Sequence, residues 1–194
     1  MARIYAVGDI FGCANELDAV LGSMDLSGSN MVVFLGNYID KGPDSRSVVD
    51  LVSDLQHNYG QEHVVALCGK HEESFLNWLD DPESAQWFME DEDLATCSTF
   101  MKHKTWESFE QVLFEKEMSE LSTSAKIAID EDYGYLVDWM RGLPSRYEIE
   151  DLDLVFTRRT VLHGGQMHDL TGHPHKDGEI PILIYDTDIN GFIE

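Results

Sequence analysis

Polar side chains follow three apolar segments of the chain, and they are of the types that bind charged ligands and transfer protons. The segments are RIYAVGDIFG, MVVFLGNYIDKG and HVVALCGKHE, and they carry Asp9, then Asn37 and Asp40, then Lys70 and His71. Carboxylate, amide, ammonium and imidazole groups gathered at one place would form a site for a charged ligand. Alternatively, each Gly-Asp or Gly-Asn pair could serve only to cap a turn.

The three segments predict buried strands, because each is a continuous apolar run that ends at a glycine. The stretch after each strand has apolar residues at helical spacing, namely Leu17, Val20 and Leu21, then Val48, Val49, Val52 and Leu55, then Phe75, Leu76 and Leu79. Alternating strands and helices predict an α/β domain with parallel strands. The carboxyl ends of such strands meet at one edge of the sheet, so the polar residues of the three loops should converge there.

The rest of the chain divides into a helical part and a strand-rich part. A helical, acidic insertion is expected at about 80–142, within a single domain of residues 1–194. The stretch TWESFEQVLFEKEMSEL would place Trp106, Phe109, Leu113 and Phe114 on one side of a helix as core residues. After Pro144, the segments DLDLVFT, TVLHGG and IPILIYDTDINGF are typical of strands.

Four histidines, His163, His168, His173 and His175, lie within thirteen residues of a glycine-rich segment. Neutral imidazoles at such a density could bind a metal ion. A loop can also collect histidines without any such role, and the sequence leaves both interpretations open for His168 and His175.

Composition excludes several classes of function. The chain has 194 residues, enough for one domain with a sizeable core, and its 13 Lys and Arg against 37 Asp and Glu give a net charge of −24. Such a surface should repel nucleic acid and anionic membranes. Three cysteines without a CxxC pair argue against a disulfide framework or a cysteine zinc site. No stretch predicts a signal peptide or a membrane-spanning helix, so we expect a cytoplasmic protein.

Five short motifs resemble those of the calcineurin-like metallophosphoesterases, in particular the bacterial serine/threonine phosphatase and diadenosine-tetraphosphatase branch. They are GDIFG (8–12), GNYIDKG (36–42), GKHE (69–72), HGG (163–165) and GH (172–173). The likeness is good over residues 3–80 and loose elsewhere. It implies a sandwich of mixed β-sheets flanked by helices, with a shortened C-terminal part. It also implies phosphate-ester hydrolysis by a pair of manganese, zinc or iron ions, which clamp the phosphoryl group and activate water.

The resemblance also shows that most metal-ligand positions are substituted. Asp9 stands at the first carboxylate position, but Phe11 replaces the neighbouring histidine and a phenyl ring has no lone pair to donate. Asn37 replaces the bridging aspartate, and a neutral amide cannot balance two dications. Lys70 replaces a ligand asparagine with an ammonium group.

Other positions of the family site are retained or ambiguous. By resemblance, Asp40 and His71 form the proton-donating dyad, while Lys41 replaces the phosphate-holding arginine. The late ligand histidine corresponds to Arg158 in one register and to His163 in the other, and His173 matches the final ligand. The short interval from His163 to His173 suggests that a substrate-contacting segment is absent.

We therefore expect a metallophosphoesterase-like protein that has lost the dinuclear centre, with no cofactor, and that binds or scaffolds. The candidate ligand is a phosphorylated protein or a nucleotide. The alternative is an active metal-dependent serine/threonine or nucleotide phosphoesterase. We further expect Lys70 to pair with Asp9 or Asp40, replacing part of the missing metal charge.

Overall fold

The computed structural model describes residues 2–193, apart from the side chain of Asp93. The strands are β1 (Arg3–Val7), β2 (Met31–Phe34), β3 (Val64–Ala66), β4 (Arg146–Ile149), β5 (Leu154–Thr157), β6 (Thr160–His163), β7 (Gln166–Asp169), β8 (Ile182–Asp186) and β9 (Gly191–Ile193). The helices are α1 (Ala14–Ser23), α2 (Ser45–Tyr59), α3 (Lys70–Asp80), η1 (Pro82–Ser84), α4 (Gln86–Glu90), η2 (Glu92–Leu94), α5 (Ala95–Thr99), α6 (His103–Glu110), α7 (Met118–Arg141), η3 (Glu150–Leu152) and α8 (Pro174–Asp177).

The larger sheet has five strands in the order β3-β2-β1-β8-β9. Strands β1, β2 and β3 are parallel, with Val7 opposite Phe34 and Phe34 opposite Ala66, whereas β8 runs antiparallel to β1. The three predicted strands and their parallel order are therefore confirmed. Strands β1 to β3 are buried on both faces, which explains why their sequences are apolar without alternation.

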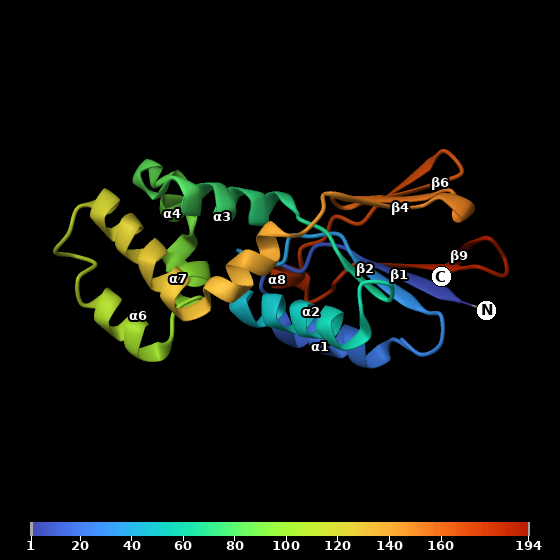
Figure 1. The fold of residues 1–194 in the computed structure, drawn as a ribbon, viewed down its shortest axis with the longest axis horizontal. Coiled ribbons are helices and arrows are strands. Elements are labelled where there is room, and N and C mark those ends of the chain that lie inside the picture. Colours follow the sequence, from blue (N-terminus) through green and yellow to red (C-terminus); the bar gives the residue numbers. More distant parts are fainter. Residues whose placement is uncertain (1, 194) are drawn as a thin grey trace.

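A second sheet of four antiparallel strands, β4-β5-β6-β7, packs against one face of the first (Figure 1). The core between the two sheets contains Ile4 and Val33 from the first and Phe156 and Val161 from the second. The later strands predicted from the sequence correspond to β5, β6, β8 and β9. Two sheets flanked by helices confirm the predicted mixed α/β class.

Helices α1 and α2 cover the other face of the first sheet, and the helices between β3 and β4 extend away beyond the carboxyl ends of β1 to β3 (Figure 1). Tyr5 and Val32 of the sheet share a core with Val48 and Val52 of α2. Loops at the carboxyl ends of β1 to β3 thus lie between the sheets and the helical segment. No helix within residues 2–193 is both long enough and apolar enough to cross a membrane.

The prediction that Phe114 is a core residue is wrong. Helix α6 ends at Glu110, and the side chain of Phe114 is 98% exposed, although Phe109 is buried. Beyond the helix, the N–H groups of Val112 and Leu113 bond to carbonyls three residues back, those of Phe109 and Glu110. Such tight turns rotate each residue further than an α-helix does, so the helical pattern no longer describes where Phe114 points.

Candidate functional site

The loops that follow β1 and β2 are joined directly by backbone hydrogen bonds. The N–H groups of Ile10 and Phe11 donate to the carbonyl of Asn37 at 3.1 and 2.9 Å, and that of Gly12 donates to the carbonyl of Tyr38 at 2.7 Å. Their polar side chains therefore face a common space at the carboxyl edge of the sheet, where α/β proteins bind ligands.

Two glycines allow this close approach. A Cβ atom at Gly42 would lie 2.0 Å from the carbonyl oxygen of Phe11, and one at Gly69 would lie 2.3 Å from the backbone nitrogen of Asn37. No side chain fits at either position without moving a loop. The glycines of the second and third motifs are thus required by packing, whatever chemistry the site performs.

Four non-glycine residues of these loops have positive φ angles. They are Phe11 (48°), Asn37 (58°), Asp40 (71°) and Lys41 (63°). Such conformations cost free energy for residues with a Cβ atom and persist only where the surroundings impose them. All four carry side chains that lie in the candidate site, so the strain is concentrated where the side chains must be aimed.

Glu72 holds the loops in place, and the sequence reasoning did not single it out. Its fully buried carboxylate accepts backbone N–H groups from Asn37 and Tyr38 at 2.8 Å, from Gly69 at 2.9 Å and from Ile39 at 3.3 Å. Burial raises the pKa of Glu72, and the four hydrogen bonds oppose that rise. A glutamate at the third position of α3 was the only local signal, because a glutamate there commonly caps a helix.

Asp9 is completely buried, and both of its carboxylate oxygens are occupied. Oδ1 accepts from Nδ2 of Asn37 at 2.6 Å and from Nε of Arg159 at 3.0 Å, and Oδ2 accepts from the backbone N–H of Gly172 at 3.2 Å. The structure therefore brings Asp9 and Asn37 together as predicted by their strands. It adds a guanidinium group that the sequence reasoning did not expect.

Arg159, not Arg158 or His163, is the late residue that meets Asp9. Both arginines follow β5, but Arg158 turns away, donating to the carbonyl of Cys68 at 3.3 Å and pairing with Glu73 at 2.9 Å. Neither register weighed from the sequence placed Arg159 there. Arg159 has a φ angle of +60°, so the chain turns at this residue. Local sequence patterns do not predict such a turn.

His163 lies at a different end of the molecule from Asp9. Its ring packs against Tyr185 at 5.0 Å between centroids, and Tyr185 pairs with Ile4, near the start of β1. The two glycines of the HGG motif are the turn of the hairpin that joins β6 and β7, with φ of 56° and 76°. Two positive φ angles are typical of a type I′ hairpin turn, so this motif has a structural explanation.

The other three histidines divide between the two ends. The ring of His168 lies tilted against Phe192, with ring centroids 4.3 Å apart, and Phe192 also contacts His163. His173 follows Gly172 and its side chain is exposed, and His175 lies 6.0 Å from it between ring centroids. Within the described residues, therefore, the four do not form one cluster.

Phe11 fills the middle of the site, and its side chain is 1% exposed. The ammonium of Lys41 lies 3.6 Å from the centre of the ring, a distance that allows a cation–π interaction. Burial and the charge of Arg159 lower the pKa of Lys41, against the influence of Asp9 and Asp40. Burial and the charge of Lys41 likewise lower the pKa of His175.

The expected pairing of Lys70 with Asp9 or Asp40 is wrong. Lys70 is exposed at the first position of α3, and it forms no ion pair with any described residue. Asp9 is paired with Arg159 instead, and Asp40 lies against His71. Motif position identified Lys70 as a residue near the site, but the start of the helix directs its side chain to solvent.

Asp40 and His71 do form a pair, with Oδ2 of Asp40 2.7 Å from Nδ1 of His71. The helical segment between β3 and β4 contributes two more partners. Thr96 donates its hydroxyl to Oδ1 at 2.9 Å, and the indole N–H of Trp87 reaches Oδ2 at 3.4 Å. Both residues are distant in sequence from the motifs, and the sequence reasoning missed them.

Asp91 fixes the helix that carries Thr96. Its carboxylate accepts the backbone N–H groups of Thr96 and Cys97, both at 2.9 Å, at the start of α5. Burial raises the pKa of Asp91, and these two hydrogen bonds lower it. A carboxylate at a helix N-terminus is electrostatically favourable, which secures the position of Thr96 against Asp40.

The residues present do not fit a pair of metal ions. The oxygens of Asp9 are taken by an amide, a guanidinium and a backbone N–H; Asn37 turns its amide nitrogen, not its oxygen, toward Asp9; and Phe11 offers no donor. No group of three or more His, Cys, Asp or Glu side chains within residues 2–193 is arranged to hold a metal ion. The positive charges at this place belong to Arg159 and Lys41.

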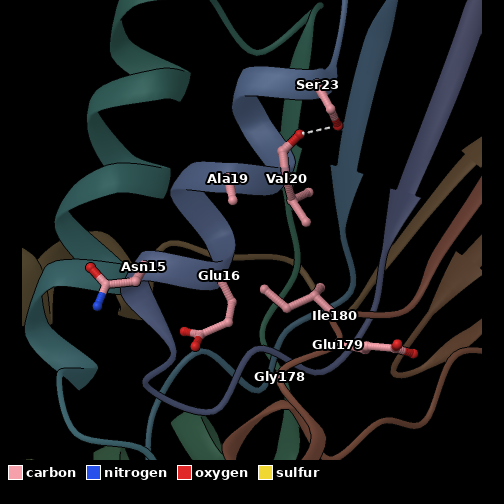
Figure 2. Close-up of a pocket in the computed structure, with 8 residues that line it drawn as sticks. All are labelled: Asn15, Glu16, Ala19, Val20, Ser23, Gly178, Glu179 and Ile180. Atoms are coloured by element: carbon pink, nitrogen blue, oxygen red, sulfur yellow. Dashed lines mark hydrogen bonds between the residues drawn. The ribbon is translucent and has the colours of Figure 1, made fainter.

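A groove along α1 lies outside the site. It is bordered by Glu16 and Glu179, with Ile180 at its base, and by a short turn of α1 in which Ser23 bonds to the carbonyl of Val20 (Figure 2). None of the residues that surround Phe11 lines it. Its carboxylates make it unsuitable for an anionic ligand.

The fold, the three glycine-bounded loops and the Asp40–His71 pair together define a phosphoesterase-type architecture. A sequence profile of the calcineurin-like phosphoesterases matches residues 2–181. The chain therefore belongs to the calcineurin-like phosphoesterase family.

Individual relatives match shorter stretches. A symmetrical bis(5'-nucleosyl)-tetraphosphatase from Wigglesworthia glossinidia brevipalpis is 32% identical over 73 residues, 37% of this chain and 25% of that protein. An asymmetrical bis(5'-nucleosyl)-tetraphosphatase from Oceanobacillus iheyensis is 36% identical over 62 residues, 27% of this chain and 25% of that protein. The matched region thus spans a quarter of the length of either relative. A metallophosphoesterase structure from Sphaerobacter thermophilus has 17% identity and a TM-score of 0.42, over 77% of this chain and 44% of that one.

Proposed function

We propose that this protein is a phosphoesterase-family member that does not assemble a metal pair or hydrolyse phosphate esters, and that acts by binding. The observation that carries this proposal is the contact of Arg159 with Asp9. A guanidinium on the first carboxylate supplies the charge that a metal ion would otherwise supply, and it occupies an oxygen that a metal ion would need. Asn37 and Phe11 support the same conclusion, because neither brings a negative charge.

The direct test is metal content and turnover of the purified protein. After dialysis against manganese or zinc and removal of excess ion, elemental analysis should give well below one metal ion per chain. An aryl phosphate and a bis(5'-nucleosyl) tetraphosphate, the latter chosen from the names of the relatives, should not be hydrolysed above background. Two bound ions per chain with clear turnover would overturn the proposal.

Restored variants sharpen this test. One variant carries Phe11→His, Asn37→Asp, Lys41→Arg and Lys70→Asn, and a second adds Arg159→His. Metal uptake should require the second variant, because the first keeps the guanidinium on Asp9. Stoichiometric uptake by the first variant would contradict the role given to Arg159.

A second candidate function, metal-dependent hydrolysis of phosphate esters, is favoured by the Asp40–His71 pair. The pair keeps a 2.7 Å contact and is braced from the helical segment. If turnover is found with added metal, His71→Asn should abolish it without changing the far-ultraviolet circular dichroism. Retention of turnover in that variant would identify a contaminating phosphatase.

We infer a cytoplasmic location for this binding role. The three cysteines, Cys13, Cys68 and Cys97, are all unpaired, and disulfides are rare in reducing compartments. Burial helps raise the pKa of Cys13 and that of Cys68 to about 11, so both are unreactive thiols at neutral pH. Cell fractionation with antibody detection tests the location.

A further inference from the structure

Four nitrogen-bearing side chains surround the ring of Phe11. The ammonium of Lys41 lies 3.6 Å from its centroid, the ring centroids of His71 and His175 lie 5.0 and 5.7 Å away, and Cζ of Arg159 lies 5.9 Å away. They come from the loop after β2, the start of α3, α8 and the turn after β5. Four separate elements thus direct donors toward one place.

Most of these donors have capacity left for a ligand. Arg159 uses Nε on Asp9, and its two terminal nitrogens bond to none of the described residues. The ammonium of Lys41 contacts the Phe11 ring and forms no ion pair within residues 2–193. Nδ1 of His175 is buried and has no hydrogen-bond partner among the described residues. Buried polar atoms are normally satisfied, so an unpaired one calls for an explanation.

Within residues 2–193 no carboxylate forms an ion pair with Lys41 or His175, although Asp177 acts electrostatically on His175 and Asp169 lies near enough to Arg159 to feel its charge. Asp9 is shared by Arg159, Asn37 and Gly172, and Asp40 is held by His71 and Thr96. Lys176 is near enough to act electrostatically on Lys41. Lys41 and Arg159 are two of only 13 Lys and Arg in a chain of net charge −24. An anion would relieve their mutual repulsion.

We propose that Lys41, Arg159 and His175 bind a phosphate dianion directly, without metal, as free phosphate or as the terminal group of a phosphorylated ligand. The terminal nitrogens of Arg159 offer the planar fork that matches phosphate oxygens, and Lys41 adds a point charge. The ring of Phe11 lies within contact range of all three side chains. The inference rests on the proposed function, since it requires the site to be free of metal pairs.

Titration of EDTA-treated protein with inorganic phosphate tests the proposal, followed by calorimetry and by ¹H–¹⁵N spectra at constant ionic strength. Binding should saturate at one phosphate per chain and shift resonances of residues 11, 41 and 175. Phosphoserine and AMP then show which molecule carries the phosphate group. Tighter binding of phosphoserine than of inorganic phosphate indicates a phosphorylated protein, tighter binding of AMP indicates a nucleotide, and equal binding of all three indicates free phosphate. Absence of saturable binding of any of the three probes would refute the proposal.

Two lysine variants provide the matched comparison. Lys41→Met should weaken phosphate binding by about tenfold or more, the value expected on losing one charge-assisted hydrogen bond. Lys70→Met removes the same charge from an exposed position, the first residue of α3. It should leave phosphate binding within about twofold. Equal weakening of phosphate binding in both variants would mean that only the overall charge of the protein matters, and it would contradict the role of Lys41. Lys41→Arg, which retains the charge, keeps the test valid if Lys41→Met folds poorly.

Metal analysis of the same samples separates the two proposals. Phosphate binding in metal-free protein supports both. Binding that appears only with added manganese, together with bound metal, overturns the proposed function. No binding in a protein that also takes up no metal refutes the phosphate site alone and leaves the proposed function standing.

Discussion

The two carboxylates of the site, Asp9 and Asp40, are held in opposite ways. Asp40 faces an imidazole, a hydroxyl and an indole N–H, all neutral or titratable donors, and two of them come from the helical segment. Asp9 faces a permanent cation, an amide and a backbone N–H, and it is fully buried. Asp40 therefore belongs to a pair that can exchange a proton. The charge of Asp9 is instead balanced by a guanidinium group that stays protonated.

This difference shows that loop geometry and loop chemistry are separable. The backbone of the loops is held by the Glu72 carboxylate and by glycines at close approaches, and all of these are contacts within the chain. The same backbone can therefore carry side chains as different as a phenyl ring, an amide and a guanidinium around Asp9. The following experiments test that separation, beginning with Glu72, which holds loops on both sides of the site.

Glu72→Gln should have the largest effect, because Glu72 holds the backbone of the second and third loops, which carry the partners of both carboxylates. Glutamine would present an NH₂ group to two of the four backbone N–H donors, and each buried donor left without an acceptor costs about 1–3 kcal/mol. We expect a loss of about 2–4 kcal/mol, measured as the free energy of unfolding in urea. Glu73→Gln is the matched control, since Glu73 is half exposed and pairs only with Arg158. An equal effect in both variants would remove Glu72 from its proposed role.

Arg159→Leu should have the next largest effect and should act on the Asp9 side alone. It leaves a buried carboxylate without its cation, but Arg159 is 35% exposed, so solvent limits the loss to about 1–3 kcal/mol. Arg158→Leu, at the adjacent residue, should cost less than about 1 kcal/mol, because its partner Glu73 is half exposed whereas Asp9 is fully buried. Adding Asp9→Asn to Arg159→Leu should recover part of the loss, because the unpaired charge is removed. A double variant less stable than the sum of the single ones would contradict the ion pair.

The sequence predicted the strands and loops that form this site better than the side chains that occupy it. Strands β1 to β3 were recognisable because a sheet buried on both faces requires continuous apolar runs. The convergence of Asp9, Asn37, Asp40 and His71 followed from parallel strands ending at one edge. Arg159 was not predictable, since its contact with Asp9 depends on a left-handed turn after β5 that joins residues 150 positions apart.

Side-chain direction was a further limit of prediction. Thr96 and Trp87 reach Asp40 through the packing of the helical segment, and no local spacing encodes that contact. Lys70 and His71 are neighbours in the same motif, yet one side chain meets Asp40 and the other enters solvent. Adjacent helical residues point about 100° apart, so a motif locates them but does not orient both.

Thr96→Val should have a moderate effect and should act on the Asp40 side alone. It removes a hydroxyl that donates to Asp40 and contacts Ser45, at a cost of about 1 kcal/mol. If Thr96 positions the pair, the imidazole resonances of His71 should also move, while those of His57 on α2 stay unchanged. Ser98→Ala, on the same helix but bonded only to the carbonyl of Ala95, is the control. Unchanged His71 resonances would leave Thr96 with a structural role only.

Lys41→Met should have the smallest effect on stability, although Lys41 lies between the two sides. Its contact with the Phe11 ring contributes about 0.5–1 kcal/mol, and its repulsion by Arg159 offsets part of that. The free energy of unfolding should therefore change by less than about 0.5 kcal/mol in phosphate-free buffer, as for Lys70→Met. Added phosphate should then stabilise the wild type and Lys70→Met more than Lys41→Met, because a ligand stabilises only the state that binds it. If Lys41→Met instead lowers the free energy of unfolding strongly in phosphate-free buffer, Lys41 has a structural role. It would then stabilise the fold as Arg159 does through its ion pair with Asp9.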